Sequence, residues 1–163
     1  MEYNPEISKA LGQALAEQAQ KALEQKANDG EVTFSDLQKV IPDLKMTVSR
    51  NRRIDGRMGC GAGYNVVLSK NNVKYYTKYN ASIVERERRP NKMDILYCIT
   101  SDARCYTLTT GFSDFCNEFG YDWYEDGAKA RRAYKSCMNA SRKLEQMFND
   151  SELEVLDKVF ENY

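Results

Sequence analysis

Arginine is concentrated in two short stretches of this sequence, and its side chain suits one kind of chemistry. The planar guanidinium group donates two parallel hydrogen bonds to a phosphate or a carboxylate. Four tyrosines lie between the two stretches, and an exposed aromatic face beside basic residues suits single-stranded nucleic acid. We therefore predict a surface that binds an anionic partner. Its candidate residues are Arg50, Arg52, Arg53 and Arg57, then Arg86, Arg88, Arg89 and Lys92, with Tyr64, Tyr75, Tyr76 and Tyr79 between them.

The charge of the chain is segregated, although its net charge is zero. Residues 1–38 carry 3 basic and 7 acidic side chains, a net charge of −4, and residues 93–163 carry 8 and 13, a net charge of −5. Residues 39–92 between them carry 13 basic and 4 acidic side chains, a net charge of +9. Such a segment favours binding to nucleic acid or to an acidic protein surface. The alternative is a solvated basic loop that the acidic helices balance.

A second candidate surface is the pair Trp123-Tyr124, which lies in an acidic stretch. An exposed Trp-Tyr pair has the composition of a protein-binding hot spot. The alternatives are a solvated loop and a carboxylate site for a metal-dependent nuclease, and nothing in the sequence fixes the geometry of such a site. The acidic residues are Asp114, Glu118, Asp122, Glu125 and Asp126.

The sequence argues against an enzyme. Histidine, the usual general base, does not occur in it. The stretch Gly59–Gly63 is not a phosphate-binding loop, because no Lys-Ser or Lys-Thr follows it and the next segment is expected to be a strand. Cys60 has no neighbouring base that would activate its thiol. We expect no cofactor and no metal. The other cysteines lack zinc-site spacing, and Cys98, Cys116 and Cys137 are expected to be buried small hydrophobes.

Residues 1–43 are expected to form two helices. Asn4-Pro5 is a helix start, and Gly30 is a plausible end. The apolar stripe of this helix is mostly Ala, so the helix either lies at the periphery of the domain or is offered to a partner, including a second copy of the chain. Thr33 with Asp36 resembles a capping box, and Pro42 ends the second helix.

Residues 44–89 are expected to form a small antiparallel sheet. Apolar and polar residues alternate with the two-residue period of half-buried strands. Three strands are predicted, over residues 44–49, 64–69 and 73–79, and a fourth extended piece over 82–86. A sheet of three or four strands needs one face covered to be stable, and the helices that follow are the natural cover.

Residues 90–163 are expected to form a helical layer. Helices are predicted after Pro90 and after Gly111, and a long helix over 128–148 is expected to pack on the apolar face of the sheet. Ser151 with Glu154 is predicted to be the capping box of a last helix. The sequence therefore predicts one α+β domain over residues 1–163.

From Asp94 onward, the chain resembles a widespread and functionally uncharacterised family of small proteins from tailed bacteriophages and prophages. The family begins with a Pro-containing helix start and D-[VI]-L-x-C-[LI]-x-S-D-A, and it continues with F-x-D-[WF]-x-x-[ED]-[FY]-G-Y-D and then Y-K-x-C. The matching residues are Pro90 and Asp94–Ala103, then Phe112, Asp114, Phe115, Glu118, Phe119, Gly120, Tyr121 and Asp122, and finally Tyr134–Cys137. Two departures are an insertion at Trp123-Tyr124 and Gly127-Ala128 in place of a Ser-Arg pair.

The resemblance implies a phage-associated accessory protein of the bacterial cytoplasm. We expect it to act by binding without catalysis, as an anti-CRISPR-type inhibitor that blocks a charged surface of a nucleic-acid-handling defence complex. The alternative is a protein that binds nucleic acid directly through its basic 50–92 segment. No apolar run is long enough to span a bilayer, so no membrane partner is expected. A homodimer through the N-terminal helix is a further alternative.

Overall fold

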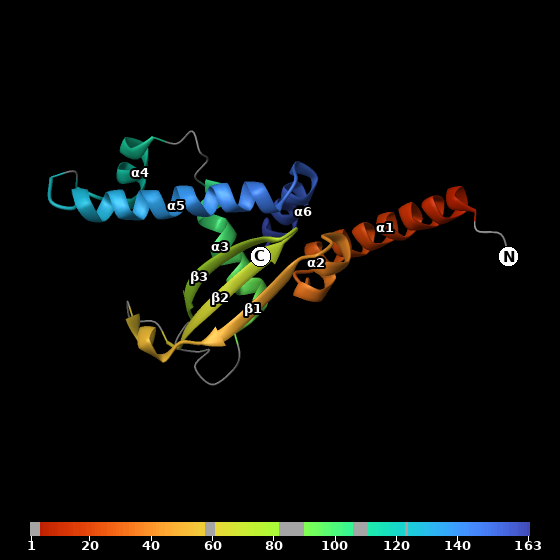
Figure 1. Ribbon diagram of the computed structural model, residues 1–163, viewed down its shortest axis with the longest axis horizontal. Helices are drawn as coiled ribbons and strands as arrows, with labels where there is room; N and C mark the ends of the chain where they lie inside the picture. Colours follow the sequence, from red (N-terminus) through yellow and green to blue (C-terminus); the bar gives the residue numbers. More distant parts are fainter. Residues whose placement is uncertain (1–3, 58–60, 82–89, 106–110, 123) are drawn as a thin grey trace.

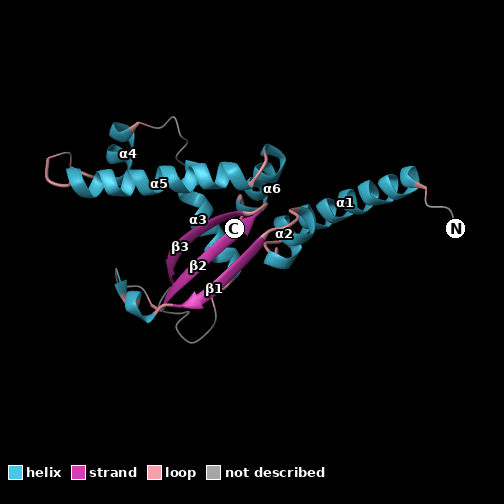
Figure 2. Cartoon of the chain, in the orientation of Figure 1, coloured by secondary structure: helices cyan, strands magenta, loops and turns pink. Residues whose placement is uncertain are grey.

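A three-stranded antiparallel sheet forms the centre of the fold (Figures 1 and 2). The structure is a computed structural model that describes residues 4–57, 61–81, 90–105, 111–122 and 124–163. The strands are β1 (Lys45–Arg50), β2 (Gly63–Lys70) and β3 (Val73–Asn80), in the order β1-β2-β3. Both neighbouring pairs are antiparallel, as the sequence predicts. The fourth extended piece, 82–86, lies outside the described residues.

The hairpin turn between β2 and β3 fixes the register of the sheet. Asn71 and Asn72 both take left-handed backbone angles, with φ of 50° and 64°. Two such residues make the tight turn whose twist matches that of the flanking strands. Leu68 consequently lies opposite Met46 on one side and Tyr75 on the other, so that apolar residues share one face of the sheet.

The apolar face of the sheet is covered mainly by α3 (Lys92–Cys105). Met93, Ile95 and Leu96 of α3 share one buried cluster with Met46 and Leu68 of the sheet. The same cluster includes side chains from three other helices, which are α1 (Pro5–Asn28), α2 (Phe34–Val40) and α6 (Asp150–Phe160). We call it the main core.

The long helix α5 (Gly127–Met147) packs against α3 and contacts the sheet mainly at β3. Only its C-terminal end, at Leu144 and Met147, joins the main core. Its N-terminal half instead packs against α4 (Phe112–Phe119), where the rings of both helices form a second, separate apolar cluster. The expectation that α5 covers the apolar face is therefore met in part, because α3 packs on this face as well.

Helix α1 projects from the body of the molecule and is buried only near its C-terminal end, as Figure 1 shows. Its start is as predicted, since the Asn4 side chain accepts hydrogen bonds from the backbone N–H groups of Glu6 and Ile7. Leu23 and Ala27 are its buried residues. The helix is thus anchored by its last two turns, while the preceding turns extend into solvent.

The capping box of α6 differs from the predicted one. The Asn149 side chain accepts a hydrogen bond from Glu152 N–H at 2.9 Å, and Asn149 N–H donates to the Glu152 carboxylate at 3.1 Å. The helix therefore begins at Asp150, and Ser151 lies within its first turn. The prediction of Ser151 with Glu154 is wrong. The actual pair lies two residues earlier in the chain, because Asn caps a helix as well as Ser does.

The predicted capping box of α2 is confirmed, and its carboxylate is also ion-paired. Asp36 accepts a hydrogen bond from Thr33 N–H at 3.0 Å, and Lys26 of α1 lies 3.0 Å from it. The Thr33 N–H, together with Lys26, lowers the pKa of Asp36 to about 2.

The lowered pKa of Asp36 makes stability depend on pH in the acid range. A carboxylate whose pKa is lower in the folded than in the unfolded chain stabilises the folded state at pH values above the unfolded pKa. This stabilisation is lost as the pH falls through the folded pKa. We expect Asp36 to contribute about 2 kcal/mol at pH 5 and to lose it between about pH 4 and pH 2. Urea unfolding of the native chain and of Asp36→Asn at pH 5 and pH 2 measures this. The difference in unfolding free energy between the two proteins should nearly vanish at pH 2. A difference that stays the same at both pH values would contradict the stabilising role of the Asp36 carboxylate.

The structure confirms the α+β fold class predicted from the sequence. Helices precede and follow the antiparallel sheet along the chain. Among the described residues, no helix combines the length and the apolar character needed to cross a membrane.

Candidate functional site

Arg50, the first member of the predicted anion-binding surface, is engaged within the fold. Its guanidinium group makes a two-pronged ion pair with the Asp55 carboxylate, one contact of which measures 2.8 Å, and it donates to the Gly63 carbonyl at 2.9 Å. Arg50 and the backbone N–H of Gly63 together lower the pKa of Asp55 to about 2. These bonds tie the loop after β1 to the first residue of β2, so Arg50 has a structural role.

The short 3-10 helix η1 (Arg52–Ile54) presents the next arginines to solvent. Ile54 is buried, and its carbonyl accepts a hydrogen bond from the Asn80 side chain at 2.7 Å. Gly63 packs so closely on η1 that an added Cβ would lie 2.2 Å from the Ile54 side chain. Arg52 and Arg53, with Arg57 just beyond, are exposed and form no ion pair with any described residue. We call these three the η1 arginines.

Lys92 is the one member of the second predicted group that the structure places. Its ammonium group lies 5.3 Å from the centre of the Phe34 ring, and it borders a shallow pocket with Met46, Val48 and Pro90. Arg86, Arg88 and Arg89 lie outside the described residues. The convergence of the two arginine groups therefore stays a prediction.

The predicted exposed aromatic face is reduced to one residue. Tyr64 is buried, and Tyr75 and Tyr79 are half-buried on the face of the sheet that packs on the main core. Only Tyr76 points outward, with 68% of its surface exposed, between the exposed residues Lys74 and Lys78. The physical reason is the two-residue period of β3, which sends neighbouring tyrosines to opposite faces of the sheet.

The exposed face of α5 is a basic surface that the sequence reasoning missed. Counted in long segments, residues 93–163 are acidic overall. Helix α5 alone nevertheless carries 6 basic side chains and 1 acidic one, Glu145, a net charge of +5. All six basic residues are exposed, and none forms an ion pair with a described residue. They are Lys129, Arg131, Arg132, Lys135, Arg142 and Lys143, which we call the α5 basic face.

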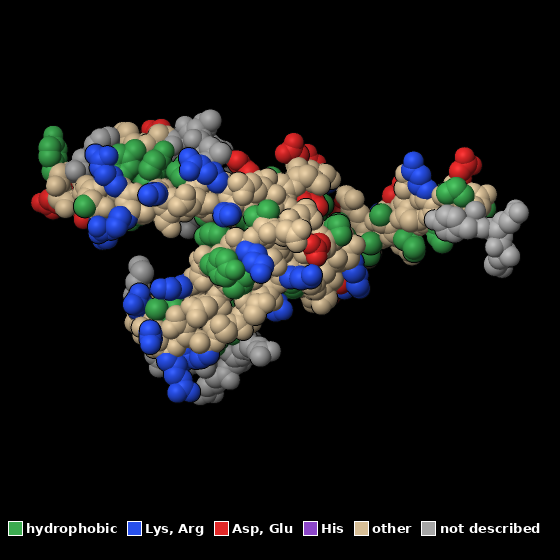
Figure 3. All heavy atoms as spheres, viewed as in Figure 1, with side chains coloured by type: hydrophobic (Ala, Val, Ile, Leu, Met, Phe, Trp, Pro, Cys, Tyr) green, Lys and Arg blue, Asp and Glu red, His purple; other side chains and the backbone are tan. Residues whose placement is uncertain are grey.

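Aromatic residues of α4 and of the turn that follows it hold part of this basic face in place. The Arg131 guanidinium lies 5.1 Å from the centre of the Phe112 ring, and Lys129 lies 5.8 Å from that of Tyr121. Stacking of this kind leaves the hydrogen-bonding edge of an arginine available. Figure 3 shows basic side chains over the N-terminal half of α5 and over the η1 end of the sheet, with the molecule hollowed between them.

The loop before α5 presents Tyr124, which is 98% exposed. Asp122 accepts hydrogen bonds from the backbone N–H groups of Tyr124 at 2.7 Å and Glu125 at 3.0 Å, and these bonds lower its pKa. The Asp126 carboxylate accepts a hydrogen bond from Asp122 N–H at 3.2 Å. Two of the predicted acidic residues thus shape the loop that exposes Tyr124. Trp123 lies outside the described residues.

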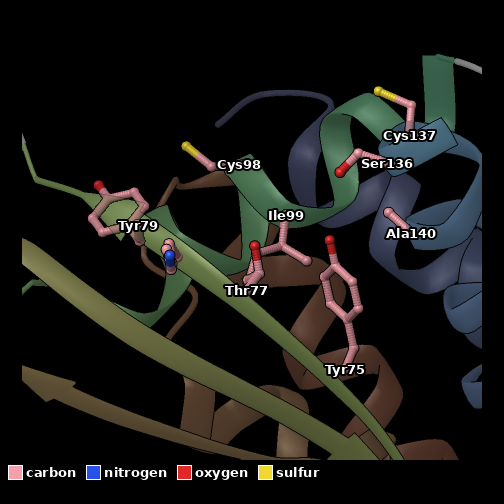
Figure 4. Close-up of a pocket in the computed structure, with 9 residues that line it drawn as sticks. Tyr75, Thr77, Tyr79, Cys98, Ile99, Ser136, Cys137 and Ala140 are labelled. Atoms are coloured by element: carbon pink, nitrogen blue, oxygen red, sulfur yellow. The ribbon is translucent and has the colours of Figure 1, made fainter. Parts of the chain in front are cut away.

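A groove of about 300 Å³ separates β3 from α3 and α5 (Figure 4). Small residues of α5, Ser136 and Ala140 among them, leave this space open, and Cys98 and Cys137 lie on its rim. Cys116 is buried as expected, and Cys137 is half-buried. The expectation that Cys98 is buried is wrong, because Cys98 lies at the open rim of this groove and is exposed.

Within the described part of the chain, no three histidine, cysteine, aspartate or glutamate side chains gather as a metal site. The candidate binding features are thus the α5 basic face, the η1 arginines, the exposed Tyr124 and the small groove beside β3. Comparison of the chain with protein-family models, with curated proteins and with solved structures finds no match.

Proposed function

We propose that this protein acts by binding, without catalysis, and that it binds the phosphate backbone of a nucleic acid. The observation that carries the proposal is the α5 basic face, where six cations point into solvent with no described acidic partner. The six cations lie between Lys129 and Lys143, so the face extends over about 21 Å along the helix. Cations spread over this distance can contact several phosphates, and the η1 arginines extend the basic surface across the hollow in the molecule.

A second candidate function is inhibition of a bacterial defence complex through its protein component. Tyr124 favours it, since an almost fully exposed tyrosine on a loop held by its own carboxylates suits a protein interface. In this proposal the protein is a phage accessory protein of the host cytoplasm and blocks a charged surface of a nucleic-acid-handling complex. A second copy of the chain remains the proposed partner of α1.

Salt dependence of binding tests the first proposal. We expect fluorescently labelled DNA and RNA oligonucleotides to bind with a log association constant that falls linearly with log salt concentration. Arg132→Glu and Lys135→Glu should each weaken binding roughly tenfold, about 1.4 kcal/mol. Each should reduce the salt slope by about one. Affinity is measured by fluorescence anisotropy between about 50 and 200 mM salt.

Lys9→Glu, an exposed charge reversal on α1, is the matched control and should leave affinity unchanged. Reversal of Arg52 and Arg53 on η1 should weaken binding as the α5 variants do. Affinity that is flat in salt would contradict nucleic-acid binding. A single protein captured from lysate regardless of nuclease, and lost with Tyr124→Ala, would support the inhibitor instead.

A further inference from the structure

The face of the sheet opposite the main core is open to solvent and carries a regular set of residues. Alternate residues of each strand point to this face, and the register places them in three rows across β1, β2 and β3. Seven of these nine residues are exposed, and the other two, Val67 and Ser69, are half-buried in the central strand. We call this set the outer sheet face. Its rows are Lys45-Ser69-Lys74, Thr47-Val67-Tyr76 and Ser49-Asn65-Lys78.

Tyr76 presents an accessible aromatic ring in the middle row of the outer sheet face. It is the large exposed aromatic residue of the sheet, and its neighbours in the row, Val67 and Thr47, have short side chains. No ring or cation of a described residue stacks on it. A ring that is open in this way can stack on a nucleic-acid base, because every base has a π-face.

The charges around Tyr76 are those that a polyanion needs. Lys74 and Lys78 lie on either side of it in β3, each about 7 Å away along the strand. Neither forms an ion pair with a described residue, whereas Lys45 lies 3.1 Å from Asp43 at the edge of the face. The outer sheet face itself contains three lysines and no acidic residue. Figure 3 shows basic side chains beside an apolar patch over the sheet.

Hydrogen bonds connect this face to the η1 arginines. The Asn51 side-chain amide donates to the Asn65 side-chain oxygen at 2.8 Å, and the Asn51 side-chain oxygen accepts from Arg53 N–H at 3.2 Å. Asn51 is also the N-cap of η1. The row that contains Asn65 and Lys78 therefore leads directly to the η1 arginines, and the two form one continuous basic surface.

We propose that the outer sheet face binds a single-stranded nucleic acid, with one base stacked on Tyr76 and the phosphates beside it held by Lys74, Lys78 and the η1 arginines. This inference rests on the nucleic-acid binding proposed above and names the form of nucleic acid that is bound. In a duplex the bases stack on one another, whereas unpaired bases can turn outward and stack on an aromatic side chain. Stacking on Tyr76 therefore selects the single strand.

Three oligonucleotides of one length test the stacking on the native full chain by fluorescence anisotropy. They are a single strand, its duplex, and an abasic single strand whose sugars carry no bases. The ordinary single strand should bind roughly tenfold more tightly than the abasic one, and more tightly than the duplex. Tyr76→Ala should weaken binding of the ordinary strand roughly tenfold and leave binding of the abasic strand unchanged.

The salt slope separates stacking from charge. Tyr76→Ala should leave the slope unchanged because it removes no cation, and Tyr76→Phe, which keeps the ring, should bind like the native chain. Lys78→Glu should weaken binding roughly tenfold and reduce the slope by about one. Lys21→Glu, an exposed charge reversal on α1, is the matched control and should change neither.

The outcomes distinguish this inference from the proposed function. A chain that binds none of the three oligonucleotides in a salt-dependent way overturns nucleic-acid binding altogether. A chain that binds all three equally, with no effect of Tyr76→Ala, keeps its phosphate contacts but has no stacking site. Equal losses of the ordinary and abasic strands in Tyr76→Ala would also overturn the stacking, because the substitution would then act through the structure of the sheet.

Discussion

Replacing Lys70 with methionine will lower the free energy of unfolding by about 3–5 kcal/mol. The Lys70 side chain is only 3% exposed, and its ammonium group lies 3.1 Å from the Glu152 carboxylate. This buried ion pair joins the end of β2 to the first turn of α6. Removing the lysine leaves the Glu152 carboxylate in a poorly solvated place with no opposite charge, which is the costly case.

Urea unfolding followed by circular dichroism measures this loss. Lys74→Met is the matched control, since Lys74 is an exposed lysine of β3, and it should change stability by less than about 0.5 kcal/mol. The double variant Lys70→Met with Glu152→Gln keeps an oxygen that accepts the Asn149 N–H but removes both charges. Its loss of stability should be about 1–3 kcal/mol smaller than the sum of the losses caused by the two single substitutions. A Lys70→Met variant as stable as Lys74→Met would contradict a stabilising role for the pair.

Lys70 also shows where sequence reasoning about the fold reaches its limit. The strand periods and the Thr33 capping box are local patterns, and each is predicted correctly because the interactions that determine it lie within a few residues. The period of β2 places Lys70 on the apolar face of the sheet, where a charge is unfavourable unless it is paired. Its partner, Glu152, is distant in sequence, so no local pattern identifies it.

The candidate site was predictable only in part, for the same reason. Arg50 belongs to the sequence cluster that predicts anion binding, but in the folded chain its guanidinium group is ion-paired with Asp55. The α5 basic face was concealed by counting charge over long segments. Reading the helical period of residues 127–147 alone would have separated its six exposed cations from the acidic loop and from α6. A net charge is informative when it is counted over one face of one element.

Replacing Phe115 with alanine will release α4 from α5 while leaving the sheet folded. Phe115 is 1% exposed, and its ring centre lies 4.6 Å from that of Phe119, 5.3 Å from that of Tyr134 and 5.9 Å from that of Tyr121. Truncating a buried phenylalanine costs about 3–5 kcal/mol. The cluster around Phe115 shares no residue with the main core, so the cost should fall locally.

Hydrogen exchange by mass spectrometry separates local from global loss. In Phe115→Ala, the amides of α4 and of the N-terminal half of α5 should exchange faster, and those of β2 should keep their native rates. Phe119→Ala is the matched control, because Phe119 is an exposed member of the same ring group and should cost less. If β2 loses protection equally, the two clusters unfold as one unit. If only α4 and the end of α5 lose it, Arg131 and Lys129 are held in place by a cluster that can open on its own. The α5 basic face would then weaken as a nucleic-acid site in Phe115→Ala without any change to its charges.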